Sequence, residues 1–303
     1  MVLLGGNVLV HDRESGDLME TQRQESCQPG KFQFKILAPS SRDIPANAST
    51  DASGSESHSD LLFDLQMLRG QVYREYAGIA ATLLPDGRHW HPLDEQSWHI
   101  LLQDPHGIVV GCARYRPILG GFEQLICSKA AIALSPVTGP VFRGAFATHV
   151  ADARRRGLHY GEASAWALSE RARCSTAAVN IALMSFALAE WLGGGVGLTT
   201  ASTRHHASLI LRRLGGKPLA GFAPYYEPMF DCSIELLHFD ISQMEPRYHT
   251  KLEEMRAELR HTPVLCPAEL PDQVNYPMSA GVPGYMSGSA NAYNGQASSL
   301  VLH

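Results

Sequence analysis

The sequence contains few cysteines and no close pair of them. Six cysteines are spread over 303 residues, and none belongs to a Cys-x-x-Cys motif. Several lie inside apolar stretches, a placement typical of reduced, buried thiols. We therefore expect neither a disulfide framework nor a zinc site of the usual spacing.

The sequence also lacks an excess of positive charge. Its formal net charge is −5 at pH 7, whereas a general nucleic-acid binder needs a cationic surface that displaces counterions from phosphates. Local basic clusters are compatible with this charge, but we expect no nucleic-acid partner.

Hydrophobic segments of the kind that target or anchor a protein are missing as well. The apolar opening, residues 1–10, has no basic flank and is followed by acidic residues, unlike a secretory signal peptide. The apolar run 177–192 carries Asn180 and Glu190 and is shorter than the roughly 20 residues of a membrane span. We interpret it as a core helix and expect a cytoplasmic protein without a membrane span.

The remaining sequence indicates one globular domain with polar flanks. Apolar residues make up 45% of the chain, enough for one sizeable core. We predict a poorly ordered segment at 1–30, a domain at 31–266 and a disordered tail at 267–303. A Ser-rich stretch at 45–60 cannot bury enough surface to offset its ordering entropy, so we predict a flexible insertion there.

Periodicity and turn signals divide the domain into strands and helices. Pro and Gly between residues 104 and 107 separate two β-rich runs, which predicts a tight hairpin. The expected strands are 31–37, 98–103, 108–115, the stretch around Glu162 and 197–201. The expected helices are 61–76, 141–156, 177–192 and 205–214.

The segment 160–215 gives the first resemblance to a known family. It orders a strand, an Arg-bearing turn, an apolar helix, a strand, and a helix running into Leu214-Gly215-Gly216. This order resembles the second half of GCN5-related N-acyltransferases, in which a strand–turn–helix holds the phosphates of an acyl carrier. The resemblance implies a single α/β domain with a mixed, mostly antiparallel sheet flanked by helices.

Two further stretches narrow the resemblance. Leu68-Arg69-Gly-Gln-Val-Tyr, followed downstream by Asp94 and Arg114, is similar to the N-terminal half of acyl-homoserine-lactone synthases and long-chain N-acyl amino acid synthases. Glu162-Ala-Ser164 is similar to their Glu-x-Ser strand. The resemblance covers roughly residues 31–256, and 225–240 looks like the amino acid synthases. These families pass an acyl group from acyl carrier protein to an amino group.

The chain departs from the lactone-forming synthases at four positions. His89 and His91 stand where those enzymes carry acids, Ile79 where they carry Trp, and Ala165 where they carry Arg. Recognition of the cationic S-adenosylmethionine favours acidic or aromatic groups. These departures therefore favour another acceptor.

Features of ordinary acetyltransferases are absent too. The glycine-containing acetyl-coenzyme A loop is replaced by 171–178, which has no glycine, and Leu211 stands where many acetyltransferases carry a general-acid Tyr. A standard small-molecule acetyltransferase is thus disfavoured. No Gly-x-Ser-x-Gly elbow indicates a hydrolase, and the glycines at 193–197 follow a helix, the wrong order for a dinucleotide site.

Glu162 and Ser164 are the candidate catalytic residues. Attack of an amine on a thioester needs a proton acceptor and donors to the oxyanion. Glu162, on the strand beside the expected thioester, is the candidate acceptor, directly or through water, and Ser164 would orient an intermediate. The alternatives are a carboxylate paired with Arg114 and a Ser that only packs.

Four residues are candidates for binding the donor phosphates. Arg171 and Arg173 precede a helix whose N-terminus offers free N–H groups and a positive dipole. Ser175 and Thr176 would cap this helix and donate to phosphate. The alternative is that both arginines are solvated surface residues.

Arg69, Asp94 and Arg114 are candidates for shaping the acceptor site, as the resemblance implies. From spacing alone they would form a structural ion-pair network. His89 and His91 have the spacing of a metal pair, but no third ligand accompanies them, so we expect no metal. We interpret 205–206, a His pair at a helix start, as surface or capping residues.

The sequence therefore predicts an N-acyltransferase. Its donor would be acyl carrier protein or acyl-coenzyme A, bound as a substrate rather than as a resident cofactor, and its acceptor a small amine. A free carboxylate on the acceptor would suit Arg69 and Arg114, which favours an N-acyl amino acid as product. The alternatives are a homoserine-lactone-type signal synthase and a non-catalytic acyl-carrier-binding module.

Overall fold

The computed structural model describes residues 32–40, 44–50, 57–76, 79–80, 84–173 and 175–268. The predicted poorly ordered segment 1–30 lies outside the described residues. So do the middle of the predicted insertion, 51–56, and all of the predicted tail except 267–268. Among the described residues, no helix is both long and apolar enough to cross a bilayer.

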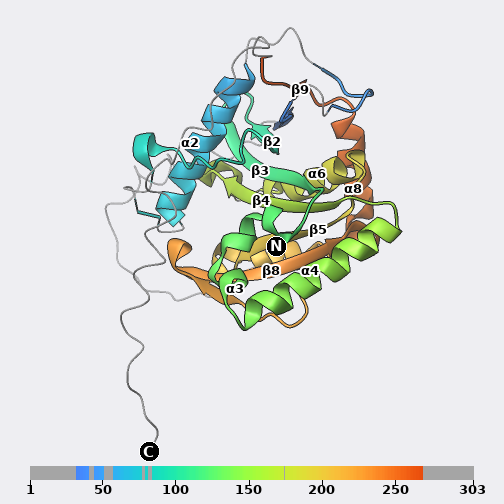
Figure 1. Ribbon diagram of the computed structural model, residues 1–303. Helices are drawn as coiled ribbons and strands as arrows, with labels where there is room; N and C mark the ends of the chain where they lie inside the picture. The colour runs from blue at the N-terminus through green and yellow to red at the C-terminus, as the bar shows by residue number, and fades with distance from the viewer. Residues whose placement is uncertain are drawn as a thin grey trace, which may run out of the picture. The chain divides into compact units, whose positions relative to one another are not determined.

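One mixed sheet organises the described chain (Figure 1). Its strands follow the order β6-β8-β5-β4-β3-β2-β1-β9, and β7 pairs with β8. The pairs β1–β9 and β4–β5 are parallel and the other pairs are antiparallel. The predicted mixed, mostly antiparallel sheet is thus confirmed. The strands are β1 (Gln33–Leu37), β2 (Trp98–Gln103), β3 (Val109–Ile118), β4 (Tyr160–Leu168), β5 (Val196–Ser202), β6 (Lys217–Pro218), β7 (Tyr225–Glu227), β8 (Cys232–Asp240) and β9 (Val264–Leu265).

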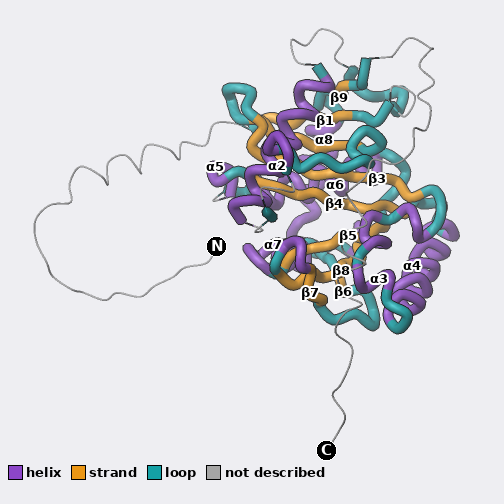
Figure 2. Tube along the Cα trace, turned by 60° about the vertical axis from the view of Figure 1, so that its left-hand side comes forward, coloured by secondary structure: helices purple, strands orange, loops and turns teal. Residues whose placement is uncertain are grey.

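Helices cover both faces of this sheet (Figures 1 and 2). On one face, α2 packs over β1–β4 and α4 packs over β4, β5 and β8. On the other, α6, α7 and α8 enclose the largest apolar core. The helices are α2 (His58–Tyr76), α3 (Ala131–Leu134), α4 (Thr138–Arg155), α5 (Glu170–Arg173), α6 (Ala177–Trp191), α7 (Ala207–Arg213) and α8 (His249–Leu259). Short 3-10 turns, among them η3 (Pro85–Gly87), η4 (Phe122–Gln124), η5 (Ile126–Lys129) and η6 (Arg204–His206), connect them.

The predicted helix at 61–76 begins earlier, within the Ser-rich stretch. Ser57 Oγ accepts the backbone N–H of Asp60 at 3.1 Å and donates to its carboxylate at 2.6 Å. This side-chain cap satisfies a free donor of the first turn. The other end of the predicted insertion contacts the sheet edge, because Ser49 O accepts the N–H of Val264 at 2.9 Å.

Two other helix boundaries also differ from prediction. The helix predicted to begin at residue 141 begins at Thr138. The helix predicted at 205–214 begins at Ala207, because η6 precedes it and His206 takes a left-handed φ of 64°. The hairpin between β2 and β3 is confirmed. Asp104 Oδ1 accepts the N–H groups of His106 and Ile108 at its turn, at 2.9 and 3.1 Å.

Strand β4 changes its pairing halfway along. It pairs with β5 only from Tyr160 to Ala163, although both strands continue further. Its register with β3 shifts between Ser164 and Ala167, where Ala165 has a φ of 54°. An extra residue in one strand of this kind is a β-bulge, which bends the strand and re-aims its side chains. β4 and β5 therefore separate beyond Ala163.

Candidate functional site

A cavity of about 650 Å³ lies where β4 and β5 separate. It is lined both by Tyr73 and Tyr76 of α2, on one face of the sheet, and by Ile181 and Phe186 of α6, on the other. The cavity therefore crosses the sheet through the gap between the two strands, and we call it the β4–β5 cavity. One face of α6 supplies much of its wall, with Ala178, Ile181, Ala182, Ser185 and Phe186.

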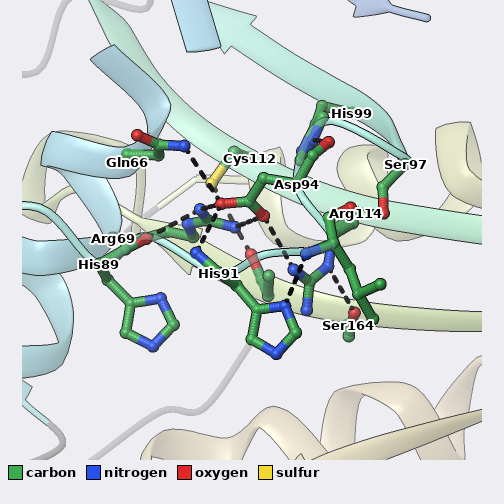
Figure 3. A network of polar contacts seen from close by, with 12 residues as sticks. Gln66, Arg69, His89, His91, Asp94, Ser97, His99, Cys112, Arg114 and Ser164 are labelled. Atoms are coloured by element: carbon green, nitrogen blue, oxygen red, sulfur yellow. Dashed lines mark hydrogen bonds and ion pairs between the residues drawn. The ribbon is translucent and has the colours of Figure 1, made fainter. Parts of the chain in front are cut away.

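Beside the cavity, a buried charge cluster centres on Asp94 (Figure 3). Arg69 donates to Asp94 from Nη1 at 3.0 Å and from Nη2 at 2.5 Å, and Arg114 donates from Nη1 at 2.8 Å. Gln66 Nε2 and the N–H of His91 add donors at 3.2 and 3.1 Å. The structure thus brings together Arg69, Asp94 and Arg114, which the sequence analysis grouped.

The cluster has the geometry of a structural ion-pair network. The side chains of Arg69 and Asp94 are fully buried and that of Arg114 is 4% exposed. Burial opposes ionisation of Asp94, but the hydrogen bonds and charge of Arg69, followed by the charge of Arg114, hold its pKa below the ordinary value. A ligand carboxylate would have to displace Asp94 to reach the Nη groups of Arg69. We therefore assign Arg69 and Asp94 to the scaffold.

A glycine allows the loop before β2 to lie against α2. A Cβ on Gly70 would stand 1.9 Å from the carbonyl oxygen of Gly87, so only glycine permits this approach. The contact places the His89 carbonyl 2.8 Å from Arg69 Nη2 and its N–H 3.0 Å from the carbonyl of Gln66.

His89 and His91 are neutral at physiological pH. Burial, followed by the charge of Arg69 for His89 and of Arg114 for His91, lowers both pKa values to about 4. His91 Nδ1 accepts the N–H of Leu93 at 3.1 Å, so its ring proton is on Nε2. Both rings point away from the Asp94 carboxylate (Figure 3). In the described chain, no group of three or more His, Cys, Asp or Glu residues could hold a metal ion.

Ser164 connects the cluster with the cavity. Its Oγ accepts a hydrogen bond from Arg114 Nε at 3.1 Å, and the residue lines the β4–β5 cavity. Arg114 and Ser164 are direct partners across β3 and β4. The hydroxyl therefore stands between a fixed cation and the space that a ligand would occupy.

Glu162 lies one cross-strand pair further along the same face. Its carboxylate accepts the N–H of Ile126 at 2.8 and 3.0 Å and that of Cys127 at 3.3 Å. It is not paired with Arg114, the alternative raised by the sequence. Burial raises the pKa of Glu162 against these hydrogen bonds. The residue does not line the cavity itself, but it adjoins Ser164 on the same face of β4.

The two arginines proposed for donor phosphates lie in different environments. The Arg173 guanidinium stacks 3.3 Å from the centroid of the Tyr76 ring, its Nε donates to the carbonyl of Leu168 at 3.1 Å, and it lines the cavity. Arg171 is 73% exposed and lies 3.8 Å from Asp104. Arg173 is thus positioned at the cavity, and Arg171 faces solvent.

Ser175 and Thr176 differ in the same way. Ser175 Oγ accepts the N–H of Ala177 at 3.1 Å and donates to the carbonyl of Ala172 at 2.7 Å, so it caps α6 as predicted. Thr176 is the N-cap residue by position but makes no side-chain cap bond, and its Oγ1 accepts from Asn180 at 3.4 Å. Both stay predictions as phosphate ligands.

Sequence reasoning missed several polar residues of this region. Arg204 and His206, from the 3-10 turn after β5, also line the cavity. Arg116 lies directly across from Glu162 on β3. A usable signal existed for Arg116. Residues two apart on a strand lie on the same face, so Arg116 shares a face with Arg114. The predicted strand 197–201 ends one residue before β5 does, and Arg204 and His206 lie in the 3-10 turn that follows it.

Solved structures with a similar backbone arrangement include two of the enzyme classes that the sequence resembles. The AHL synthase LasI is 14% identical, with a TM-score of 0.44 over 70% of this chain and 91% of its own. TofI, in a ternary complex with an inhibitor and MTA, is 16% identical, with a TM-score of 0.49 over 75% and 99%. FeeM, an N-acyl amino acid synthase from uncultured soil microbes, is 14% identical, with a TM-score of 0.40 over 71% and 93%. No protein-family model and no curated protein matches the sequence.

Proposed function

We propose that the protein transfers an acyl group from a thioester to the amino group of a small acceptor. The observation that carries this proposal is the β4–β5 cavity, which has an apolar wall on α6 and reaches a polar wall at Ser164. Its volume lies within the range of small-molecule sites. An acyl chain fits the apolar wall, and the reacting carbonyl would lie near Ser164.

The donor would enter along the basic side chains. Arg173 and Arg204 both line the cavity, and guanidinium groups bind phosphate with charge-assisted hydrogen bonds. Stacking on Tyr76 fixes the Arg173 side chain, so little side-chain entropy remains to be lost on binding. This arrangement suits a phosphate-bearing acyl carrier, whether coenzyme A or the prosthetic group of acyl carrier protein.

The chemistry would proceed by direct attack. The amine nitrogen would bond to the thioester carbonyl carbon, and backbone N–H groups of β4 beyond Ala163, where the pairing with β5 ends, would stabilise the oxyanion. Glu162 accepts the amine proton, a role that the raised pKa of its carboxyl suits. The carbon–sulfur bond then breaks, and the thiolate leaves with that proton.

The test is turnover by the purified full chain. Acyl-coenzyme A and acylated carrier protein of several chain lengths would be incubated with a panel of amines, with free thiol and amide product measured. We expect thiol release that depends on the amine, and long-chain N-acyl amino acids in lipid extracts of overproducing cells. The proposal is overturned if no donor and amine combination releases thiol. Accumulation of a lactone labelled from methionine would instead select the signal-synthase alternative.

A further inference from the structure

Arg116 has an unoccupied hydrogen-bonding edge. Its Nε and Nη2 atoms are shielded from solvent and have no hydrogen-bond partner within the described chain. These two atoms form one edge of the planar guanidinium, the edge that matches a carboxylate with two parallel hydrogen bonds. The residue as a whole is half-buried, on β3.

The same edge is filled in other arginines of this protein. Arg212 donates from Nε and Nη2 to the two carboxylate oxygens of Glu235, at 2.9 and 2.7 Å. Arg256 does so to Glu190, at 2.8 and 2.5 Å. Arg116 has a carboxylate directly opposite in Glu162, yet no ion pair between them is formed in the described structure, because the backbone of Ile126 and Cys127 holds that carboxylate.

The open edge lies close to the proposed reaction. Arg116 and Arg114 are two residues apart on β3 and face Glu162 and Ser164 on β4. Same-face neighbours on a strand are about 6.6–6.8 Å apart. A carboxylate held at Arg116 would therefore leave an amine a few bonds away within reach of Ser164 and the cavity, beside the proposed proton acceptor.

The open edge is costly without a ligand. A buried donor without a partner forfeits its hydrogen bond to water, and burial lowers the pKa of Arg116 while the nearby Glu162 opposes this. The guanidinium can also turn toward a ligand without breaking any hydrogen bond of these two nitrogens. An edge without a partner and a guanidinium that can turn toward a ligand are both properties of a binding residue. We would expect the same edge of a purely structural arginine to be hydrogen-bonded within the protein.

We propose that Arg116 binds the carboxylate of the amine acceptor through Nε and Nη2, so that the acceptor is an amino acid or another amino carboxylate. This inference rests on the proposed function and names its acceptor class. It moves the carboxylate site from Arg69 and Arg114, which Asp94 occupies, to the next residue on the same face of β3.

Binding of the twenty standard amino acids, each as free acid and as carboxamide, tests the proposal by calorimetry with the full chain. We expect at least one acid to bind about 10- to 100-fold more tightly than its amide, the range of a charge-assisted bidentate contact. Arg116→Gln should reduce binding of the acid to that of the amide and leave the amide unchanged. Arg116→Lys, which keeps the charge without the planar edge, should fall between them.

Arg155→Gln is the matched control, because Arg155 is 71% exposed on α4 and forms an ion pair with Asp152 of its own helix. The melting temperature of ligand-free Arg116→Gln should equal or exceed that of the native protein, since no internal hydrogen bond of this edge is lost. Equal binding of acid and amide, binding of none of the twenty, or an unchanged acid preference in Arg116→Gln would overturn the assignment.

Turnover separates this inference from the proposed function. Transfer to amines regardless of a carboxylate would keep the acyltransferase and exclude the role of Arg116. Arg116-dependent binding of an acid without any thiol release from an acyl donor would keep the carboxylate site and exclude acyl transfer.

Discussion

Two neighbouring pairs on β3 and β4 share one face of the sheet and differ in how their polar groups are used. In the first, Arg114 is held between Asp94 and Ser164. In the second, Arg116 faces Glu162 without a hydrogen bond between the two side chains, and the Nε and Nη2 atoms of Arg116 have no hydrogen-bond partner within the described chain. The first pair belongs to a network that positions the strand. The second combines a guanidinium edge without a hydrogen-bond partner with a carboxyl group of raised pKa, the two groups to which we assign the acceptor carboxylate and the amine proton.

The comparison shows why buried charge alone does not locate a site. The Asp94 carboxylate accepts five hydrogen bonds, from Gln66, Arg69, His91 and Arg114, and of the Arg69 side-chain nitrogens Nε lacks a partner within the described chain. A network of this kind is expensive to alter, and with a single unpaired donor it offers a carboxylate no guanidinium edge that could form two parallel hydrogen bonds. Partial satisfaction, next to a cavity, is the more informative observation.

The largest expected effect is on catalysis by the second pair. Glu162→Gln should lower kcat about 10²- to 10⁴-fold, the range for loss of a general base. Burial raises the pKa of Glu162 above its ordinary 4.5. As the pH is lowered, kcat should therefore begin to fall while the pH is still above 4.5. This acidic limb of the pH profile should be absent in the variant. The measurement is a pH profile of kcat for both proteins.

Glu235→Gln is the control for this substitution, since Glu235 is also a buried glutamate but binds Arg212 and Ser208. It should reduce stability and leave kcat near the native value. Native turnover by Glu162→Gln at all pH values would show that Glu162 only anchors the turn at Ile126.

Substitutions in the network of the first pair should lower the stability of the protein. Asp94→Asn leaves two buried guanidinium groups without their counter-charge, so the free energy of unfolding should fall by about 3–5 kcal/mol, as measured by urea titration. The pKa of Asp94 is lowered from 3.8 in the folded state. Its contribution is therefore present above pH 4 and lost as the pH falls toward the folded value.

The stability of Asp94→Asn should consequently depend less on pH below 4 than that of the native protein. Asp86→Asn serves for comparison, because Asp86 pairs with Arg88 at the surface, 52% exposed, and should leave the urea midpoint unchanged. Equal midpoints for native protein and Asp94→Asn would contradict a stabilising role for the network.

The sheet and the Asp94 network could be predicted because both depend on which side chains occur at which positions of the sequence. Two β-rich runs separated by Pro and Gly gave β2 and β3, and three spaced charged residues, Arg69, Asp94 and Arg114, came together as expected. The hydrogen bonds of the Glu162 carboxylate could not be predicted, because the donors are backbone N–H groups of η5. The side-chain sequence gives no signal for a backbone donor.

The start of α2 was missed for a different reason. Ser57 and Asp60 form a cap inside a Ser-rich stretch whose composition suggested an insertion. Amino-acid composition describes a whole stretch of sequence, whereas a helix cap depends on the residues at two particular positions within that stretch. The β4–β5 separation depends on a β-bulge with a left-handed Ala165, a conformation that alanine rarely adopts and that the sequence does not suggest.

Arg171 and Arg173 extend the comparison to the donor side, because Arg173 stacks on Tyr76 at the cavity whereas Arg171 is exposed and lies 3.8 Å from Asp104. Arg173→Ala should raise the donor KM about 10- to 100-fold, as expected for a lost charge-assisted contact. Arg171→Ala should change it far less, since an exposed arginine contributes little. Steady-state kinetics with acyl-coenzyme A measure both. Equal effects of the two substitutions would show that the solvent-facing Arg171 also meets the donor.

The smallest effect concerns Ser164, which belongs to the first pair and also lines the β4–β5 cavity. Ser164→Ala leaves Arg114 Nε without its acceptor, so the free energy of unfolding should fall by about 1–3 kcal/mol. Turnover should fall much less than in Glu162→Gln, because Asp94 still holds the Arg114 guanidinium through Nη1. Urea titration and kcat on the same preparation separate the two roles. A loss of kcat as large as that of Glu162→Gln, with stability unchanged, would mean that the hydroxyl takes part in the reaction and that the two pairs act as one site.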